Sequence, residues 1–172
     1  MNAVLVPRLS PARSPLRATA MASAGFAAVL AAGCDGPSSP AFLFQTGRFE
    51  QSLTSAQALA ANADAAALNL VGIHYYVGAG VERDFTAAGQ WFERAARLGN
   101  ADAQRNLGVL YLRGLGVRQD DFLAFAWFTE AAERGNARAL AYLAQMGDAL
   151  TPSQVVKARH ALDDEIGQHS GR

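Results

Sequence analysis

The sequence contains one 36-residue segment written twice, and this repeat constrains the fold more than any other feature. Residues 65–100 align with residues 101–136 without a gap, and 15 of the 36 aligned positions are identical. The identical residues are mostly small, aromatic or turn-forming. Self-similarity at this period is typical of stacked-repeat proteins, in which one unit cannot bury its apolar face alone.

Each copy predicts two helices separated by a glycine turn. Apolar residues at helical spacing predict a first helix over 65–77 and again over 101–113. Two glycines then permit the left-handed backbone that a helix exit needs, and an aspartate follows where an N-cap is expected. A glycine inside each first helix suggests that the backbone of a neighbouring helix passes close by. The predicted framework consists of Gly72, Tyr75, Gly78, Gly80, Asp84 and Trp91 in the first copy and Gly108, Tyr111, Gly114, Gly116, Asp120 and Trp127 in the second.

The shared pattern A-x-A-x4-G-x2-Y-x2-G-x-G-V-x2-D-x3-A-x2-W-F-x2-A-A-x2-G-N resembles the Sel-like repeat, a relative of the tetratricopeptide solenoids. The resemblance extends over roughly residues 45–165, as two full repeats with degenerate flanks. It implies an all-α fold, a right-handed α/α superhelical solenoid of antiparallel helical hairpins with degenerate end caps. It also implies a protein that binds other proteins. We expect no cofactor.

The domain boundaries follow from this register. We expect a signal peptide at 1–34, a linker at 35–44, a repeat domain at 45–166 and a tail at 167–172. Within the domain, helix 48–62 is expected to cap the first repeat, because Ser55 and Ala56 stand where the repeats have their Trp-Phe pair. A partial repeat is expected at 137–147. The sequence Thr151-Pro-Ser-Gln154 is typical of a helix start and predicts a second cap helix over 152–166.

The leader predicts export. Residues 1–34 hold three arginines and no acidic residue. The last of these arginines, Arg17, precedes the alanine-rich apolar run Ala18–Ala32, which is too short for a comfortable membrane span. The segment Leu30-Ala-Ala-Gly-Cys34 resembles the lipobox of bacterial lipoproteins, which implies a lipid anchor on Cys34. Asp35 resembles the signal that retains lipoproteins in the inner membrane. An ordinary signal peptide with an incidental cysteine, or a transit peptide, are the alternatives.

The residues that could carry chemistry are few and scattered. The three histidines, His74, His160 and His169, show no metal-ligand spacing, and His74 is expected to be a satisfied surface or groove residue. The formal net charge is zero, with 15 basic and 15 acidic residues, and no basic stripe suggests nucleic acid as a partner. Without the three leader arginines, the chain is mildly acidic. We therefore expect no enzyme, no metal and no nucleic-acid partner.

The resemblance implies that first helices line a concave groove that binds a partner protein or peptide. The positions facing away from the Gly72 and Tyr75 stripe mix aliphatic, aromatic and polar side chains, as a peptide-binding surface does. Some of them could instead pack against the next repeat, whereas the arginines among them are expected at the surface. The candidate groove residues are Asn69, Ile73, Tyr76, Arg105, Asn106, Val109, Leu112 and Arg113.

Two functions fit these expectations. The first is a membrane-tethered adaptor or regulator in the bacterial cell envelope, facing the periplasm and holding another protein in its groove. The alternative is a secreted effector that acts on host or neighbouring-cell proteins. The sequence names no partner for either.

Overall fold

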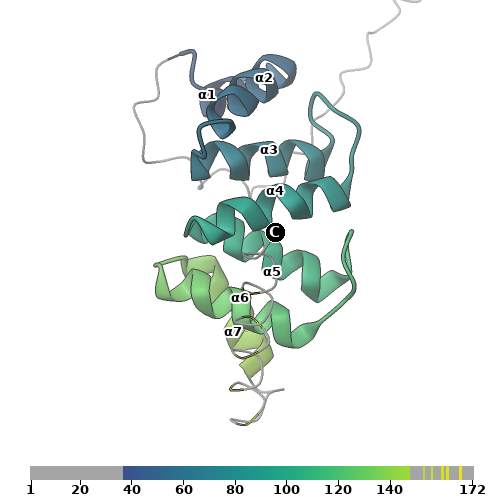
Figure 1. Ribbon diagram of the computed structural model, residues 1–172, viewed down its shortest axis with the longest axis vertical. Coiled ribbons are helices and arrows are strands. Elements are labelled where there is room, and N and C mark those ends of the chain that lie inside the picture. The colour runs from purple at the N-terminus through teal and green to yellow at the C-terminus, as the bar shows by residue number, and fades with distance from the viewer. Residues whose placement is uncertain are drawn as a thin grey trace, which may run out of the picture. The chain divides into compact units, whose positions relative to one another are not determined.

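The computed structural model describes residues 37–147 together with Ser153, Val156, His160, Leu162 and Gly167. This part of the chain is helical and contains no strand (Figure 1). The predicted signal peptide with Cys34 lies outside the described residues, as do most of cap helix 152–166 and tail 167–172. The helices are α1 (Pro40–Gln45), α2 (Phe49–Ala60), α3 (Ala65–Val77), α4 (Phe85–Arg97), α5 (Ala101–Arg113), α6 (Asp121–Glu133) and α7 (Ala137–Gly147).

The two repeats fold as the predicted hairpins. Helices α3 and α5 have the expected bounds, and each ends at a glycine in the left-handed region, with φ of 76° at Gly78 and 63° at Gly114. The N-cap prediction for Asp84 is confirmed, since its Oδ1 accepts hydrogen bonds from the first free N–H groups of α4 at 2.8 and 3.0 Å. Asp120 caps α6 in the same way. The expectation of an all-α solenoid is therefore confirmed.

Successive helices pack against one another along the stack. Helix α3 pairs with α4 and α5 with α6 inside the repeats, while α4 packs on α5 and α6 on α7 between them. First helices (α1, α3, α5 and α7) therefore alternate with second helices (α2, α4 and α6) (Figure 1). The Gly-Asn pair that ends each repeat also starts the next helix, because Asn100 and Asn136 cap α5 and α7 through their Oδ1 atoms. This tight junction is one reason why the repeats align without a gap.

The glycines inside the first helices correct one expectation. A Cβ atom on Gly72 would lie 2.6 Å from the Phe92 ring, and one on Gly108 would lie 2.8 Å from the Phe128 ring. The close neighbour is therefore an aromatic side chain of the same hairpin and not the backbone of a neighbouring helix. Backbone approach occurs instead at Gly116, where a Cβ would lie 2.4 Å from the carbonyl carbon of Phe85 in the preceding repeat.

A short helix lies in the stretch that was expected to be linker. Helix α1 begins at Pro40, and the Ser39 Oγ accepts a hydrogen bond from the Phe42 N–H at 3.2 Å. Helix α1 packs against α2. The turn of the first repeat also contacts this hairpin, because Gly80 packs on the start of α2 in the same way that Gly116 packs on the start of α4. Residues 40–60 therefore form a degenerate hairpin at the end of the stack, and α2 falls within the predicted cap 48–62.

His74 joins this terminal hairpin to the first repeat. The expectation of a surface or groove histidine was wrong, because the side chain is fully buried. Its Nδ1 lies 2.6 Å from the Ala79 carbonyl oxygen and its Nε2 lies 2.9 Å from the Ser52 Oγ. The Ser52 Oγ also lies 2.8 Å from the Pro40 carbonyl oxygen. One buried polar chain thus connects α1, α2 and the end of α3.

Candidate protein-binding face

The residues predicted to line a groove occupy the first helices α3 and α5, but most of them are buried. Asn69, Ile73, Arg105, Asn106 and Val109 are all less than a tenth exposed. Each contributes to packing within or between repeats, so the alternative interpretation holds for this group. The expectation that Arg105 lies at the surface was wrong.

The two asparagines bind each other. Asn106 Nδ2 donates a hydrogen bond to Asn69 Oδ1 at 3.0 Å, between α5 and α3. This hydrogen bond is a buried polar tie between the two first helices. A buried amide pair is stable only when its hydrogen bonds are made, so its role in the apo structure is structural.

The partly exposed members of the predicted set are Tyr76, Leu112 and Arg113. Tyr76 and Leu112 are half-buried, and the Tyr76 ring meets Phe85 edge-on with centroids 5.3 Å apart. Arg113 is exposed in the last turn of α5, where a positive charge interacts favourably with the helix dipole. These residues remain accessible to a partner.

Two side chains on α7, which are not among the predicted groove residues, lie near the accessible ones on α3 and α5. Arg138 and Tyr142, on α7, interact electrostatically with Arg105 on α5, and so does Tyr76 on α3. The three first helices therefore bring side chains together around Arg105. Register alone could have placed Arg138 and Tyr142 on the third first helix, but that helix departs from the repeat pattern. We call Asn69, Tyr76, Arg105, Asn106, Leu112, Arg138 and Tyr142 the first-helix face.

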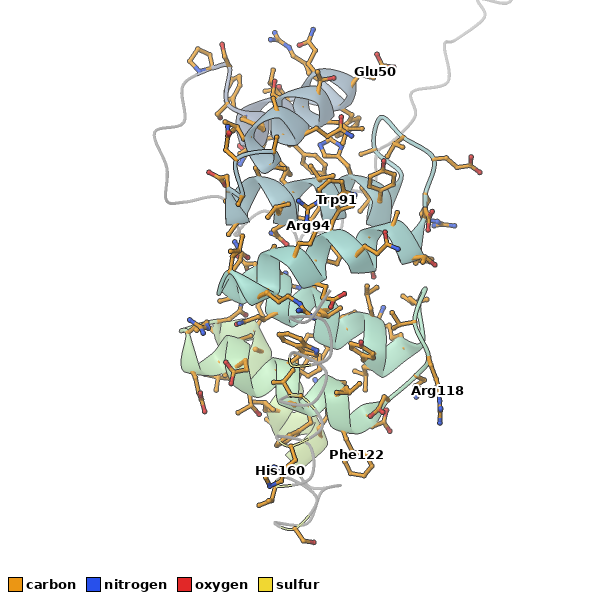
Figure 2. All side chains as sticks on the ribbon, in the orientation of Figure 1. Glu50, Trp91, Arg94, Arg118, Phe122 and His160 are labelled. Atoms are coloured by element: carbon orange, nitrogen blue, oxygen red, sulfur yellow. The ribbon has the colours of Figure 1, made fainter. Side chains whose placement is uncertain are left out.

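The second helices present a different surface. Trp91 on α4 is partly exposed, and Arg94 lies over its ring with the guanidinium carbon 4.6 Å from the centroid (Figure 2). The equivalent Trp127 is only 1% exposed. Leu162, 3% exposed, joins the same buried cluster as Trp127. Equivalent tryptophans in the two repeats are thus framework residues with different degrees of burial.

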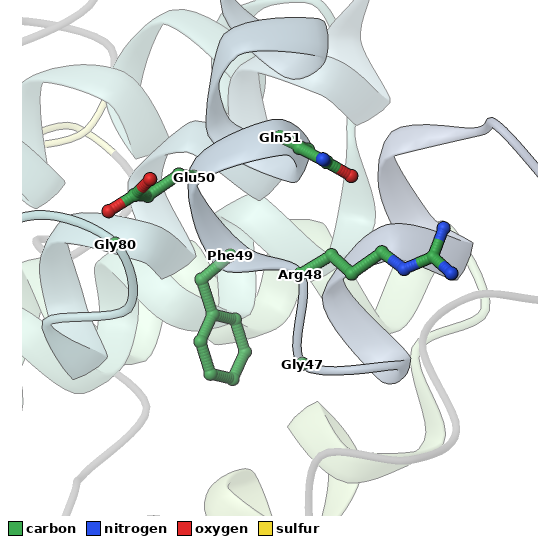
Figure 3. A pocket seen from close by; sticks show the side chains of 6 residues that line it. All are labelled: Gly47, Arg48, Phe49, Glu50, Gln51 and Gly80. Carbon is green, nitrogen blue, oxygen red and sulfur yellow. The ribbon is translucent and has the colours of Figure 1, made fainter.

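The structure also has a depression of about 340 Å³ at the start of α2, away from the predicted groove residues. It is lined by Gly47, Arg48, Phe49, Glu50, Gln51 and Gly80 (Figure 3). Arg48 stands where Asp84 and Asp120 cap the later helices, and it makes no side-chain capping bond. In Figure 3 its side chain extends away from Gly80. This hollow contains no group of residues that indicates catalysis.

The chemistry available in the described residues is that of recognition. No three His, Cys, Asp or Glu side chains among them gather where they could hold a metal ion. None of the described helices is long and apolar enough to cross a membrane. What the site offers is a set of aromatic, amide and guanidinium groups on adjacent first helices, which suits binding to another polypeptide.

Comparisons with known proteins agree with this arrangement. The Sel1 repeat family matches residues 65–100 and 101–136. A Sel1 repeat protein from Oxalobacter formigenes is 34% identical, with a TM-score of 0.60, over 62% of this chain and 44% of that protein. The protective antigen c5321 of uropathogenic Escherichia coli, which displays an SLR fold, is 27% identical, with a TM-score of 0.66, over 74% of this chain and 28% of that one. The chain thus spans less than half the length of either structure. A comparison with curated proteins found no match.

The family match and the fold point to one assignment. The matched segments are the two units of the internal repeat, and their helix bounds, turn glycines and caps are those described above. The family indicates a role in protein–protein interaction. The chain therefore contains two Sel1 repeats, at residues 65–100 and 101–136, and its described helices have the fold of solved Sel1 repeat structures.

Proposed function

We propose that this protein is a non-catalytic, membrane-tethered adaptor in the periplasm of a bacterial envelope, which holds a partner polypeptide against its first-helix face. The observation that carries the proposal is the convergence of Tyr76, Arg105 and Tyr142 from three successive first helices. A surface made of several repeats contacts a longer stretch of a partner than a single hairpin could. Aromatic and arginine side chains are also the types that most often dominate binding energy at interfaces.

The location rests on the leader. The lipobox-like segment ending at Cys34 supports acylation, and a tether at this position leaves the repeat domain on the outer side of the inner membrane. Stable anchoring requires two or more acyl chains, and Cys34 is the only cysteine in the chain. Cys34→Ser is therefore expected to leave the leader uncleaved or to release the protein from membranes. A Cys34→Ser variant that is cleaved and sediments with membranes like wild type would exclude the lipid anchor.

Site-specific photo-crosslinking in living cells tests the binding face. A photoreactive phenylalanine analogue at Leu112, half-buried on α5, is expected to give a discrete adduct with one envelope protein. The matched control is the same analogue at Leu98, which is 53% exposed after α4 and lies outside the first-helix face. The same adduct from both positions, or an adduct from Leu98 alone, would place binding on another surface.

A further inference from the structure

Arg105 is a buried cation whose partners in the chain do not satisfy it. The residue is 8% exposed, and its Nε–H has no hydrogen-bond acceptor. The nearest carboxylate is that of Asp102, 4.0 Å from Nη2, which is beyond hydrogen-bond distance. That carboxylate already accepts a hydrogen bond from Asn136 Nδ2 at 2.8 Å, where it fastens the junction with the next hairpin. A buried polar group without a partner is costly, so its retention calls for an explanation.

The surroundings of Arg105 favour an anion. Burial lowers the pKa of Arg105 below its ordinary value, the Asp102 carboxylate opposes this effect, and the positive charge of Arg138 adds to it. Arg138 itself makes no ion pair within the described part of the chain. Arg105 therefore lies within the electrostatic influence of a second guanidinium group, with its one carboxylate neighbour 4.0 Å away, and an added negative charge would offset this repulsion.

The charge of the first helices is opposite to that of the rest of the domain. Helix α3 has no acidic or basic residue except His74, and Asp102 is the one acidic residue on α5 and α7. The same two helices carry three basic residues, Arg105, Arg113 and Arg138. Taken together, the second helices α2, α4 and α6 carry five acidic and two basic residues, and both basic residues are on α4. The positive charge is thus concentrated on the layer that carries the first-helix face.

We propose that Arg105, assisted by Arg138, binds the carboxylate of an aspartate or glutamate side chain in a partner peptide that crosses the first-helix face. The planar guanidinium presents N–H donors in a fork that matches a carboxylate. Tyr76 on α3 and Tyr142 on α7 lie near enough to interact electrostatically with it. Since α5 is the middle one of three first helices, a chain that crosses the layer passes Arg105 midway. A side chain therefore fits this position better than a chain end. This inference rests on the proposed function and specifies the partner as acidic.

Nuclear magnetic resonance can test the site with the isotopically labelled protein. The probe is an acetylated, amidated peptide Gly-Leu-Glu-Leu-Gly, and its control has glutamine in place of glutamate. We expect the glutamate peptide to bind about tenfold more tightly, as one charge-assisted hydrogen bond implies, and to shift the Arg105 Nε–H resonance. Arg105→Met and Arg138→Gln should each reduce this preference. Arg94→Met, which removes an exposed arginine from the second helix α4, should leave it unchanged.

Each contrary outcome has a distinct meaning. Equal affinity for the two peptides, no binding of either, or an equal loss in Arg94→Met would overturn the carboxylate site. A third peptide has glutamine and a free C-terminal carboxylate. If it binds as tightly as the glutamate peptide, the ligand of Arg105 is the C-terminal carboxylate of a partner and not a side chain. Crosslinking from Leu112 is independent of all three results. If Leu112 gives an adduct but the glutamate peptide binds no more tightly than the glutamine peptide, the binding face is supported and the acidic ligand is excluded.

Discussion

The Ser52–His74 pair offers a double-mutant test of what joins the terminal hairpin to the first repeat. The equivalent positions one repeat later hold Ala88 and Leu110, and both are fully buried. The double variant Ser52→Ala/His74→Leu therefore installs an apolar pair that the same fold already accommodates. Replacing both partners of a buried hydrogen bond by apolar groups is nearly neutral when the shape fits. The double variant still leaves the Pro40 and Ala79 carbonyls without their donors, so we expect it to lose stability, but by less than the sum of the two single losses.

The single variants should behave differently. Ser52→Ala leaves His74 Nε2 and the Pro40 carbonyl without their partner, and a buried unsatisfied group costs about 1–3 kcal/mol. His74→Leu leaves Ser52 bonded to Pro40 but removes the partner of the Ala79 carbonyl, so its cost should lie at the low end of the same range.

Urea denaturation of the four proteins, followed by circular dichroism, gives the coupling energy. The two single losses should exceed the loss in the double variant by about 1 kcal/mol or more. Unchanged slopes of the unfolding free energy against urea would show that the comparison concerns stability alone. A double variant that loses the full sum of the two single losses would refute the reasoning. The bonds to the Pro40 and Ala79 carbonyls would then account for the losses, with no coupling through the Ser52–His74 hydrogen bond.

Four further predictions concern single features of the stack. The lowered pKa of buried His74 means that the unfolded chain takes up a proton first as pH falls below about 6.5. The free energy of unfolding should therefore fall with acidification, and an unchanged pH profile in His74→Leu would contradict this. Trp127→Ala should cost about 3–5 kcal/mol by denaturation and the partly exposed Trp91→Ala clearly less; equal losses would be inconsistent with their burial. Gly116→Ala should cost more than about 2 kcal/mol, because φ is +68° and the added Cβ meets backbone. Arg48→Asp should raise the melting temperature by supplying the missing cap, worth about 1 kcal/mol.

The hairpins could be predicted from the sequence because their signals are local. A helix end needs a left-handed residue, which Gly78 supplies, and a helix start needs a side-chain acceptor, which Asp84 supplies three residues or fewer from the N–H groups it binds. A local signal for α1 was also present in Ser39-Pro40, a cap followed by proline at the first helical position. The glycine, prolines and serines of residues 35–40 favour a linker instead, because these residue types are typical of turns and loops.

Burial of polar residues could not be predicted, because it depends on residues distant in the sequence. Nothing near His74 indicates that Ser52 will face it, and nothing near Asn69 indicates Asn106. From the spacing within its own helix, Arg105 is expected to be exposed. Its burial becomes evident only when α3 and α7 are placed on either side of α5. Side chains from separate hairpins determine these environments, whereas the periodicity describes only one hairpin at a time.

The differences between the two copies locate recognition more closely than their identities do. Identical residues build the hairpin: the turn glycines, the caps and the small residues against which Phe92 and Phe128 pack. On the first helices, by contrast, Asn69 is replaced by Arg105 and Tyr76 by Leu112 at equivalent positions. A stack can vary these side chains while its framework stays the same, because each repeat needs only its neighbours for stability. In the proposed function, a partner would therefore meet unequal chemistry at position 69 and its equivalent, a paired amide in one repeat and an incompletely paired guanidinium in the next.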